Sequence, residues 1–305
     1  MHNGANPNQQ ECALVAEARD RGIEIRCLET YAELREVEEI QRQVWGMEPI
    51  EIVPGAQLRA AEHAGGLVAG AFEQGVMIGF VYGFLAAPTG RGMKGLGMHS
   101  HMLAVRHSGR GTGVGKALKW FQRDWCLARG IEWVCWTFDP LQAKNARLNM
   151  FHLGAVSNEY LPDFYGPMTG PLGGNQETDR LLALWQLSDP NVAEIAAGGS
   201  PVSYTQRFPA SAPDVWLVSA TELERGTPKT APELAAALRS AAPGAALRIA
   251  APPDASSLLK DDAGSANVWR RAIRGAILPA LDAGYSVVDF SGGAYALRKD
   301  ARQET

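Results

Sequence analysis

The sequence predicts a mixed α/β fold, in which strands and helices alternate around one mixed sheet up to residue 187. Two observations support this prediction. Short apolar segments rich in strand-forming residues alternate with segments whose apolar residues recur at helical spacing. In addition, one glycine-rich segment lies between an expected strand and an expected helix, where many α/β proteins bind a phosphate group.

The composition is that of a globular protein, with 46% hydrophobic and 20% charged residues among 305. These fractions exclude a disordered or fibrous chain. The net charge of −4 argues against a broad nucleic-acid-binding surface, because such surfaces neutralise phosphates with an excess of Lys and Arg. The longest apolar stretch, residues 76–88, is too short to cross a bilayer as a helix. We therefore expect neither a nucleic-acid partner nor a membrane partner.

The cysteines and the N-terminal residues indicate the compartment. The four cysteines include no Cys-x-x-Cys pair, and four cysteines do not make a disulfide framework in a chain of this length. We expect them to be reduced thiols that pack as small hydrophobic groups. Residues 1–10 have neither a basic start nor an apolar core, so they do not resemble a secretory signal. The sequence thus predicts a soluble, cytoplasmic protein.

Local patterns place the helices and strands in order. Thr30 and Glu33 form a capping-box pattern that opens an amphipathic helix, which continues through Val44. Glu73-Gln74-Gly75 is a hairpin signal between two strands, and Gly130 ends a long helix. Strands are expected at residues 23–27, 67–72, 76–85, 99–105, 131–138 and 181–187. Helices are expected at residues 11–21, 30–44, 56–63, 113–129 and 145–153.

Four segments are expected along the chain. Residues 1–22 form a flexible N-terminus or a short helix, and residues 23–187 form the main domain. Residues 188–214, which mix Pro, Gly, Ala and Ser, are interpreted as a linker. Residues 215–305 form a small C-terminal α/β unit without a recognisable catalytic motif. Its strands are expected at residues 215–218, 247–250, 286–290 and 294–298, and its helices at 231–239 and 268–283.

The segment with the most chemical information is Arg110-Gly-Thr-Gly-Val-Gly-Lys116. Its glycines allow several backbone N–H groups to converge on one point without obstruction from Cβ atoms, and the helix N-terminus adds the positive end of its dipole. Such a loop can bind a phosphate or pyrophosphate, and Arg110 and Lys116 can add positive charge.

Three kinds of phosphate site use such a loop. A Walker P-loop is excluded, because Arg110 stands at its first glycine position and Ala117 stands where the magnesium-binding hydroxyl belongs. A dinucleotide fingerprint fits poorly, because the spacing is Gly-x-Gly-x-Gly and the loop lies deep in the chain. The pattern Arg-x-x-Gly-x-Gly, typical of a loop that binds the pyrophosphate of coenzyme A, matches Arg110, Gly113 and Gly115.

With these residues the chain resembles the GNAT acyltransferases over residues 25–187. The resemblance implies the GNAT fold, in which helices flank a mostly antiparallel central sheet. Several strings also resemble a branch of predicted GNAT acetyltransferases that carries an added C-terminal region. These strings are Met98–Met102, Trp136–Leu141, Asn145-Ala146 with Asn149, Leu153-Gly154, Thr178–Arg180, Trp269-Arg270 and Gly284-Tyr285.

The resemblance also implies which residues hold the coenzyme. In GNAT proteins the fourth and fifth strands splay apart, and the pantetheine arm lies between them. Carried over, the backbones of Leu103, Ala104 and Val105 would hold the pantetheine and the thioester, and the Val105 N–H would be a donor to the oxyanion. Asn145 matches a position that contacts the coenzyme arm, and it also suits a helix N-cap. The pyrophosphate would be bound by Arg110, Gly111, Thr112, Gly113, Val114, Gly115 and Lys116.

Transfer to an amine requires a base, because the attacking nitrogen must be neutral. His99 and His101 lie on the same face of the expected strand, near the position where the family often places its base, and histidine titrates near neutral pH. The other interpretation is that both are hydrogen-bonded packing groups. Asp139, which ends a strand, is a candidate base or orienting acid, although Asp-Pro also terminates strands. No third ligand accompanies His-x-His at suitable spacing, so we expect no metal.

The sequence departs from the family pattern at the proton donor. Many GNAT enzymes carry a tyrosine in the last helix, and this tyrosine protonates the leaving thiolate. Met150 occupies that position here and Phe151 follows it, and neither side chain can donate a proton. Tyr160 or Tyr165 from the following segment, or water, would have to take this role.

The sequence therefore predicts an N-acetyltransferase that uses acetyl-CoA as co-substrate. We expect the acceptor to be an amine of a small molecule or peptide, which attacks acetyl-CoA directly in a ternary complex. Because the usual tyrosine is absent, the alternative is a non-catalytic acyl-CoA-binding module that senses the coenzyme or assembles a partner. The C-terminal region is expected to cover the acceptor groove or to form a homodimer contact; a degenerate second GNAT-like half is the other interpretation.

Overall fold

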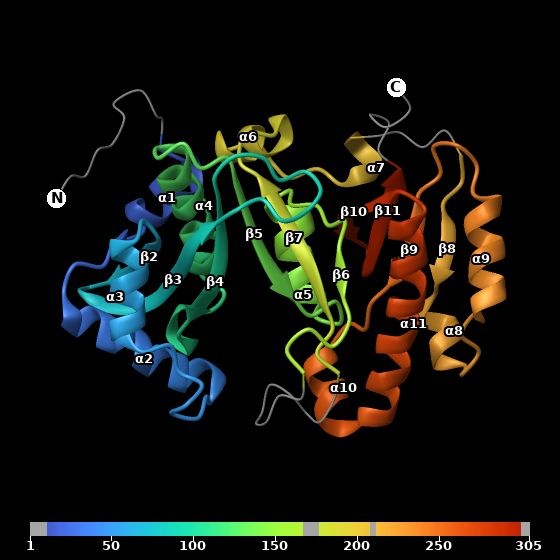
Figure 1. Ribbon diagram of the computed structural model, residues 1–305, viewed down its shortest axis with the longest axis horizontal. Helices are drawn as coiled ribbons and strands as arrows, with labels where there is room; N and C mark the ends of the chain where they lie inside the picture. Colours follow the sequence, from blue (N-terminus) through green and yellow to red (C-terminus); the bar gives the residue numbers. More distant parts are fainter. Residues whose placement is uncertain (1–10, 167–176, 208–211, 300–305) are drawn as a thin grey trace. The chain divides into compact units, whose positions relative to one another are not determined.

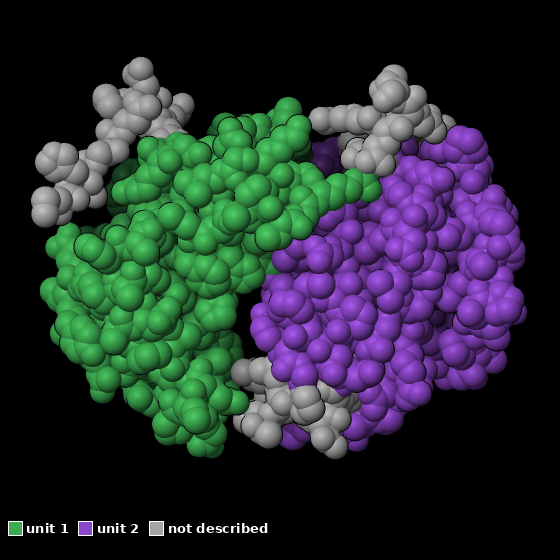
Figure 2. Space-filling view, in the orientation of Figure 1, with its two compact units in different colours: residues 1–136, 186–200 green, residues 137–185, 201–305 purple. Residues whose placement is uncertain are grey.

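The computed structural model describes residues 11–166, 177–207 and 212–299. The chain divides into two compact units, which Figure 2 colours separately. Unit 1 comprises residues 1–136 and 186–200, and unit 2 comprises residues 137–185 and 201–305. The boundaries of these two units differ from those of the four segments expected from the sequence, and the four segments stay a prediction.

Unit 1 is built on a mostly antiparallel sheet, as the sequence predicted. Its strands lie in the order β1-β2-β3-β4-β5. Neighbouring strands from β1 to β4 are antiparallel, and β5 is parallel to β4. The bounds are β1 (Ile23–Cys27), β2 (Leu67–Glu73), β3 (Val76–Ala86), β4 (Gly97–Val105) and β5 (Trp133–Phe138), of which residues 137 and 138 belong to unit 2.

Helices cover both faces of this sheet (Figure 1). The apolar faces of α2 and α3 pack on one side against Phe80 and Met102. On the other side α4 packs against β2, β3 and β4, and α1 packs against α4 and β1. The bounds are α1 (Ala13–Asp20), α2 (Tyr31–Trp45), α3 (Gly55–His63) and α4 (Val114–Leu127).

The local signals in the sequence explain where these elements begin and end. The Thr30 side chain accepts from Glu33 N, and the Glu33 carboxylate accepts from Thr30 N, so the predicted capping box starts α2. The hairpin between β2 and β3 turns at Gln74 and Gly75, whose φ angles of 50° and 80° match the left-handed turn that twisted strands favour.

β4 contains a β-bulge at His101. Against β3, Met102 pairs with Tyr82 and Ser100 pairs with Gly83, so His101 is one residue more than the ladder needs. The bulge therefore interrupts the regular alternation of side chains along the strand.

The bulge divides β4 into two halves that face opposite layers. Before it, Met98 and Ser100 contact residues of α4. After it, Met102 and Ala104 pack into the core formed with α2 and α3. If the alternation continued regularly through His101, all four side chains would point to one face of the sheet.

β4 and β5 are paired only at their beginnings. The register runs from Gly97↔Trp133 to His99↔Cys135, and among the described residues no pair continues it. We call the unpaired continuation of the two strands, Ser100–Val105 on β4 and Trp136 on β5, the fork. It leaves one edge of the β4 backbone without a partner strand.

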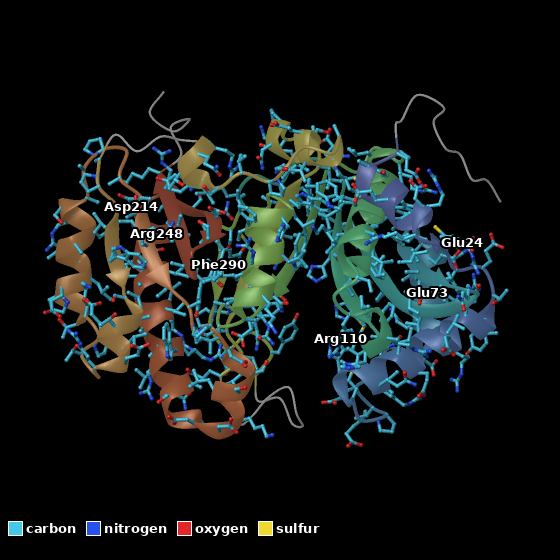
Figure 3. The ribbon with its side chains drawn as sticks, turned by 180° about the vertical axis from the view of Figure 1, so that it is seen from behind. Glu24, Glu73, Arg110, Asp214, Arg248 and Phe290 are labelled. Carbon is cyan, nitrogen blue, oxygen red and sulfur yellow. The ribbon has the colours of Figure 1, made fainter. Side chains whose placement is uncertain are left out.

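Unit 2 contains a four-stranded sheet in the order β10-β11-β9-β8. Helices α9 and α11 pack against it. Asp214, just before β8, lies 3.9 Å from Arg248 of β9 (Oδ2 to Nε), and both are labelled in Figure 3. The bounds are β8 (Val215–Val218), α8 (Ala220–Glu224), α9 (Ala231–Ser240), β9 (Leu247–Ala250), α10 (Ala255–Asp261), α11 (Ala263–Asp282), β10 (Tyr285–Ser291) and β11 (Ala294–Lys299).

Unit 2 also contains the segment that follows β5. Here the expected helix at residues 145–153 begins earlier, as α5 (Ala143–Ala146), and continues as a π-helical turn, Arg147–His152. The strand β7 (Arg180–Gln186) was predicted, whereas its antiparallel neighbour β6 (Tyr160–Leu161) was not.

The stretch interpreted as a linker holds two short helices, α6 (Pro190–Ala196) and α7 (Tyr204–Arg207). The Asp189 side chain caps α6 by accepting from Asn191 N, and proline stands in its first turn. Across the described ranges, no helix has both the length and the apolar character needed to span a membrane.

Candidate functional site

The glycine-rich loop lies between β4 and α4, as the sequence predicted. A 3-10 turn, His107–Gly109, leads into it, and Thr112 Oγ1 donates to Gly109 O at 2.7 Å. Gly111 and Gly113 have φ angles of 81° and 86°, which favour glycine because a Cβ atom is strained there. These contacts fix a tight loop at the start of α4.

This loop presents backbone N–H groups to a ligand. The Ala117 N–H donates to Gly113 O at 3.0 Å and closes the first turn of α4. The amides of Val114, Gly115 and Lys116 precede it, so the helix itself supplies no acceptor for them. Together with the positive end of the helix dipole, they suit the pyrophosphate of coenzyme A.

Arg21 is a component of this site that the sequence did not reveal. It follows α1, and its Nη1 donates to Thr112 O at 2.9 Å. Arg110, which Figure 3 labels near the beginning of α4, is exposed on the same loop. The loop thus combines free amides with two guanidinium groups from distant parts of the chain.

The fork exposes the backbone of β4 that was expected to hold the coenzyme arm. Arg106 N donates to Ile78 O of β3 at 2.8 Å. Because N–H groups along an antiparallel strand point alternately to either edge, the amide of Ala104 also faces β3. The amides of Leu103 and Val105 consequently face the other edge, toward the fork.

His99 and His101 stand together with two aromatic side chains of β3. The imidazole of His99 stacks on Phe84, with centroids 5.1 Å apart, and His101 makes an edge contact with Tyr82 at 5.7 Å. The two imidazole centroids are 6.1 Å apart. Phe84 is 38% exposed, so one side of this cluster is open to solvent.

The surroundings of His99 favour its neutral form. Burial lowers its pKa to about 4, and the nearby His101 and Lys119 act in the same direction. Its Nδ1 lies 3.6 Å from the Cys135 Sγ, across the last pair before the fork. At neutral pH this imidazole is therefore unprotonated, and the same low pKa makes it a weak base.

In unit 2, Asp139 is held by an arginine. Arg270 donates from Nη1 and Nη2 to the two carboxylate oxygens, at 3.1 Å each, and Leu141 N donates to Oδ1 at 2.9 Å. Both oxygens are thus occupied, which favours an orienting or structural role over that of a base. Arg270 belongs to the Trp269-Arg270 string, whose role the sequence did not reveal.

Tyr160, a candidate catalytic acid, is also engaged within unit 2. Its hydroxyl donates to Asp179 Oδ2 at 2.6 Å, and Arg274 binds the same carboxylate. Burial, together with the neighbouring carboxylate, raises the pKa of Tyr160. Tyr165 is exposed, and its hydroxyl lies 2.9 Å from Thr137 Oγ1. These contacts disfavour Tyr160 as a proton donor.

Asn145 is the third residue of α5 and is exposed. The N-cap of this helix is Gln142, so Asn145 does not serve as the cap. It lies in unit 2, as do Asp139 and Tyr160, whereas the glycine-rich loop, the fork, His99 and His101 all lie in unit 1. The roles of Asn145, Asp139 and Tyr160 toward the coenzyme stay predictions.

Within the described part of the chain, no group of three or more His, Cys, Asp or Glu side chains is arranged to hold a metal ion. His99 and His101 are accompanied by aromatic side chains.

Residues 14–154 match the model of the acetyltransferase (GNAT) family. A comparison with curated protein sequences gave no significant match. Among solved structures, the ribosomal-protein-S18-alanine N-acetyltransferase from Escherichia coli is 17% identical, with a TM-score of 0.44; the match covers 55% of this chain and 95% of that one.

Two further solved structures are similar over the same share of the chain. An N-acetyltransferase from Staphylococcus aureus Mu50 is 13% identical, with a TM-score of 0.43, and the match covers 54% of this chain and 99% of that one. A GNAT family acetyltransferase from Elizabethkingia anophelis, solved with acetyl-CoA bound, is 12% identical, with a TM-score of 0.41, and the match covers 54% and 98%.

Proposed function

Because residues 14–154 form a GNAT acetyltransferase domain, we propose that this protein transfers an acetyl group from acetyl-CoA to an amine of a small molecule or peptide. The amine attacks the thioester directly, while both substrates are bound. Acyl transfer is the activity of the family, and the amine acceptor is what we add to it.

One observation carries the proposal: a single strand, β4, supplies the open edge of the fork and leads directly into the glycine-rich loop. The loop offers the amides of Val114, Gly115 and Lys116 to the pyrophosphate. The fork offers the amides of Leu103 and Val105 to the pantetheine arm and the thioester. The coenzyme would thereby be held at its pyrophosphate and along its pantetheine arm by backbone groups, which do not depend on side-chain chemistry.

We assign the role of base to His99, assisted by His101. A neutral imidazole accepts a proton from the attacking amine, and burial holds His99 in that form at neutral pH. Phe84 fixes the His99 ring by stacking and forms an apolar surface beside it. An amine with an apolar or aromatic body would be desolvated against this surface.

The reaction then balances as follows. The amine nitrogen forms a bond to the carbonyl carbon of the thioester, and the oxyanion that develops accepts a hydrogen bond from the Leu103 N–H, the fork-facing amide nearer to His99 and Ser100. The Val105 N–H, which was expected in this role, lies four strand residues from Ser100, about 13 Å, and suits the pantetheine arm instead. His99 takes one proton from the nitrogen. The C–S bond breaks, and its electron pair leaves with the sulfur of coenzyme A, which then takes up a proton.

Coenzyme binding is tested by calorimetric titration with acetyl-CoA, free coenzyme A and ATP. We expect binding of both coenzyme forms in the micromolar range and none of ATP. Arg110→Ala and Lys116→Ala should weaken coenzyme binding, because both remove positive charge from the loop. No binding of either coenzyme form by the wild-type protein would remove the basis of the proposal.

The base assignment is tested with His99→Ala and His101→Ala, assayed for acetylation over a panel of amines. We expect loss of product with coenzyme affinity retained. His63→Ala, which changes an exposed histidine at the end of α3, is the matched control. Full activity of both variants would overturn the assignment, and coenzyme binding without product from any amine would favour the non-catalytic acyl-CoA-binding module.

A further inference from the structure

A buried lysine lies beneath the fork. Lys119 belongs to α4, and it is only 4% exposed. Its Nζ donates to Ser100 Oγ at 2.7 Å and to Gln122 Oε1 at 3.2 Å, and it stands 3.7 Å from the centroid of the Trp136 ring. These three contacts satisfy an ammonium group, which would otherwise be costly to bury.

The contacts place Lys119 where the two strands diverge. Ser100 is the first residue of β4 beyond the last pair with β5, and Trp136 is the first residue of β5 beyond that pair. The amino group therefore touches both arms of the fork at its closed end, on the side of the sheet that α4 covers. The same end of the fork holds the aromatic cluster of His99 on the opposite face.

The proposed reaction so far names no proton donor for the leaving sulfur. Met150 and Phe151 cannot donate a proton, and the Tyr160 hydroxyl is occupied by Asp179. The Tyr165 hydroxyl is exposed and lies 2.9 Å from Thr137 Oγ1. The Ser100 hydroxyl, in contrast, lies at the fork and is backed by an ammonium group at hydrogen-bond distance.

We propose that Ser100 and Lys119 form the proton relay that neutralises the thiolate of coenzyme A as it leaves. This inference rests on the proposed function and names the missing donor. When the C–S bond breaks, the Ser100 hydroxyl gives its proton to the sulfur, and Lys119 gives a proton to the Ser100 oxygen. Free coenzyme A thiol, intact Ser100 and a neutral Lys119 result, and Lys119 regains its proton from water. Ser100 is the catalytic residue, and Lys119 is a positioning residue that acts through it.

The environment of Lys119 suits it to give up a proton. Burial lowers its pKa to about 7, although the neighbouring Cys126 and Cys135 thiols act in the opposite direction. An acid works best when its pKa lies near the working pH. Gln122 fixes the second hydrogen of the amino group, so the first is directed at Ser100.

The test uses acetyl-CoA with hydroxylamine as the acceptor, and the thiol released is measured. Hydroxylamine is largely neutral at pH 7, so it needs little help from a base, and the departure of sulfur is isolated from the role of His99. Lys119→Met keeps the length of the side chain, Ser100→Ala removes the hydroxyl, and Ser100→Thr keeps it. Lys260→Met, on the exposed surface of α10, is the matched control.

We expect Lys119→Met and Ser100→Ala to lower kcat by about 100-fold, as for the loss of a general acid, while KM for acetyl-CoA stays unchanged. Lys260→Met should stay within about twofold of the wild type, and Ser100→Thr, which keeps the hydroxyl, should recover activity relative to Ser100→Ala. The wild-type rate should fall as pH rises above about 7, and Lys119→Met should lose this pH dependence.

Wild-type rates for both relay variants, or an unchanged pH profile in Lys119→Met, would overturn the relay. The fluorescence melting curve of each variant distinguishes the expected loss of activity from misfolding, which should not occur in Ser100→Ala because it removes only one oxygen. Binding of acetyl-CoA by calorimetry is measured on the same samples. If the wild-type protein binds acetyl-CoA and the relay variants are fully active, the relay alone is wrong; if the wild type does not bind acetyl-CoA, the proposed function itself is wrong.

Discussion

Arg21 donates from Nη1 to the carbonyl oxygen of Thr112 at 2.9 Å, across 91 residues of chain. Its Nε also donates to Glu17 O at 3.2 Å, so the end of α1 fixes the guanidinium. This bond ties the N-terminal helix to the glycine-rich loop and brings a third positive charge to the loop that carries Arg110 and Lys116. It also orients the Thr112 peptide unit, which precedes the free amides.

Replacing Arg21 with Ala should weaken coenzyme A binding about three- to tenfold, because the loop loses a charge and one of its anchors. Calorimetric titration at two salt concentrations measures this effect, which should shrink at the higher one. Arg19→Ala is the control, since Arg19 forms an exposed ion pair with Glu11. Equal loss of affinity in both variants would contradict a specific role for Arg21.

Glycine is the only residue type that fits at position 97, the start of β4. A Cβ atom there would lie 2.2 Å from the indole ring of Trp133, its neighbour on β5. Gly97→Ala should lower the free energy of unfolding by about 1 to 3 kcal/mol, because a buried tryptophan must move. Urea denaturation measures the change. Gly275→Ala, in the middle of α11 with its nearest atom 3.9 Å away, is the control and should be neutral or slightly stabilising.

The pH dependence of stability should reflect the burial of Lys119. Its pKa falls from 10.5 to about 7 on folding. Between these two values the unfolded chain carries a proton that the folded protein lacks, so this group makes stability rise with pH, by at most about 1.4 kcal/mol per pH unit. Below pH 7 both states are protonated, and the contribution no longer changes.

In the Lys119→Met variant, the free energy of unfolding should therefore lack this rise with pH. Urea denaturation between pH 6 and 10 measures the unfolding free energy of the variant and the wild type. The difference between them should shift in favour of the wild type as pH increases through this range. Parallel curves would show that the lysine is solvated in the folded protein.

Arg270→Met should destabilise unit 2 by about 3 to 5 kcal/mol, because it leaves the carboxylate of Asp139 without its partner. The double variant that also carries Asp139→Asn should recover part of this loss, since the uncompensated charge is gone. Arg271→Met removes the exposed neighbouring arginine and is the control. A thermal melt of the three variants distinguishes the ion pair from a general loss of charge on α11.

Elements with local signals could be predicted from the sequence. The expected strand at residues 23–27 coincides with β1, and α2 begins directly after Thr30. Both follow from hydrophobic periodicity or capping, which act over a few residues. The strand β6 and the helix α7 have two and four residues, too few for a periodic signal, and β6 exists because it pairs with β7.

In the candidate site, too, the features with local sequence signals could be predicted and those that depend on distant partners could not. The glycine-rich loop could be predicted because its conformation depends on glycines close together in the sequence. The contributions of Arg21 and Lys119 could not, because each depends on the partner that the fold brings to it. Lys119 stands in the sequence between Leu118 and Trp120, both fully buried, and this position was the one local sign that its side chain is not solvated.

The bulge at His101 is an addition to β4 that the two layers of the sheet do not need. Ser100 and Met102 already pair with adjacent residues of β3, Gly83 and Tyr82. Deleting His101 would therefore remove the bulge without turning either half of the strand. Ser100 would still reach Lys119, and Met102 and Ala104 would stay in their core. Packing alone thus gives no reason for a residue at position 101, and the proposed role of its imidazole supplies one.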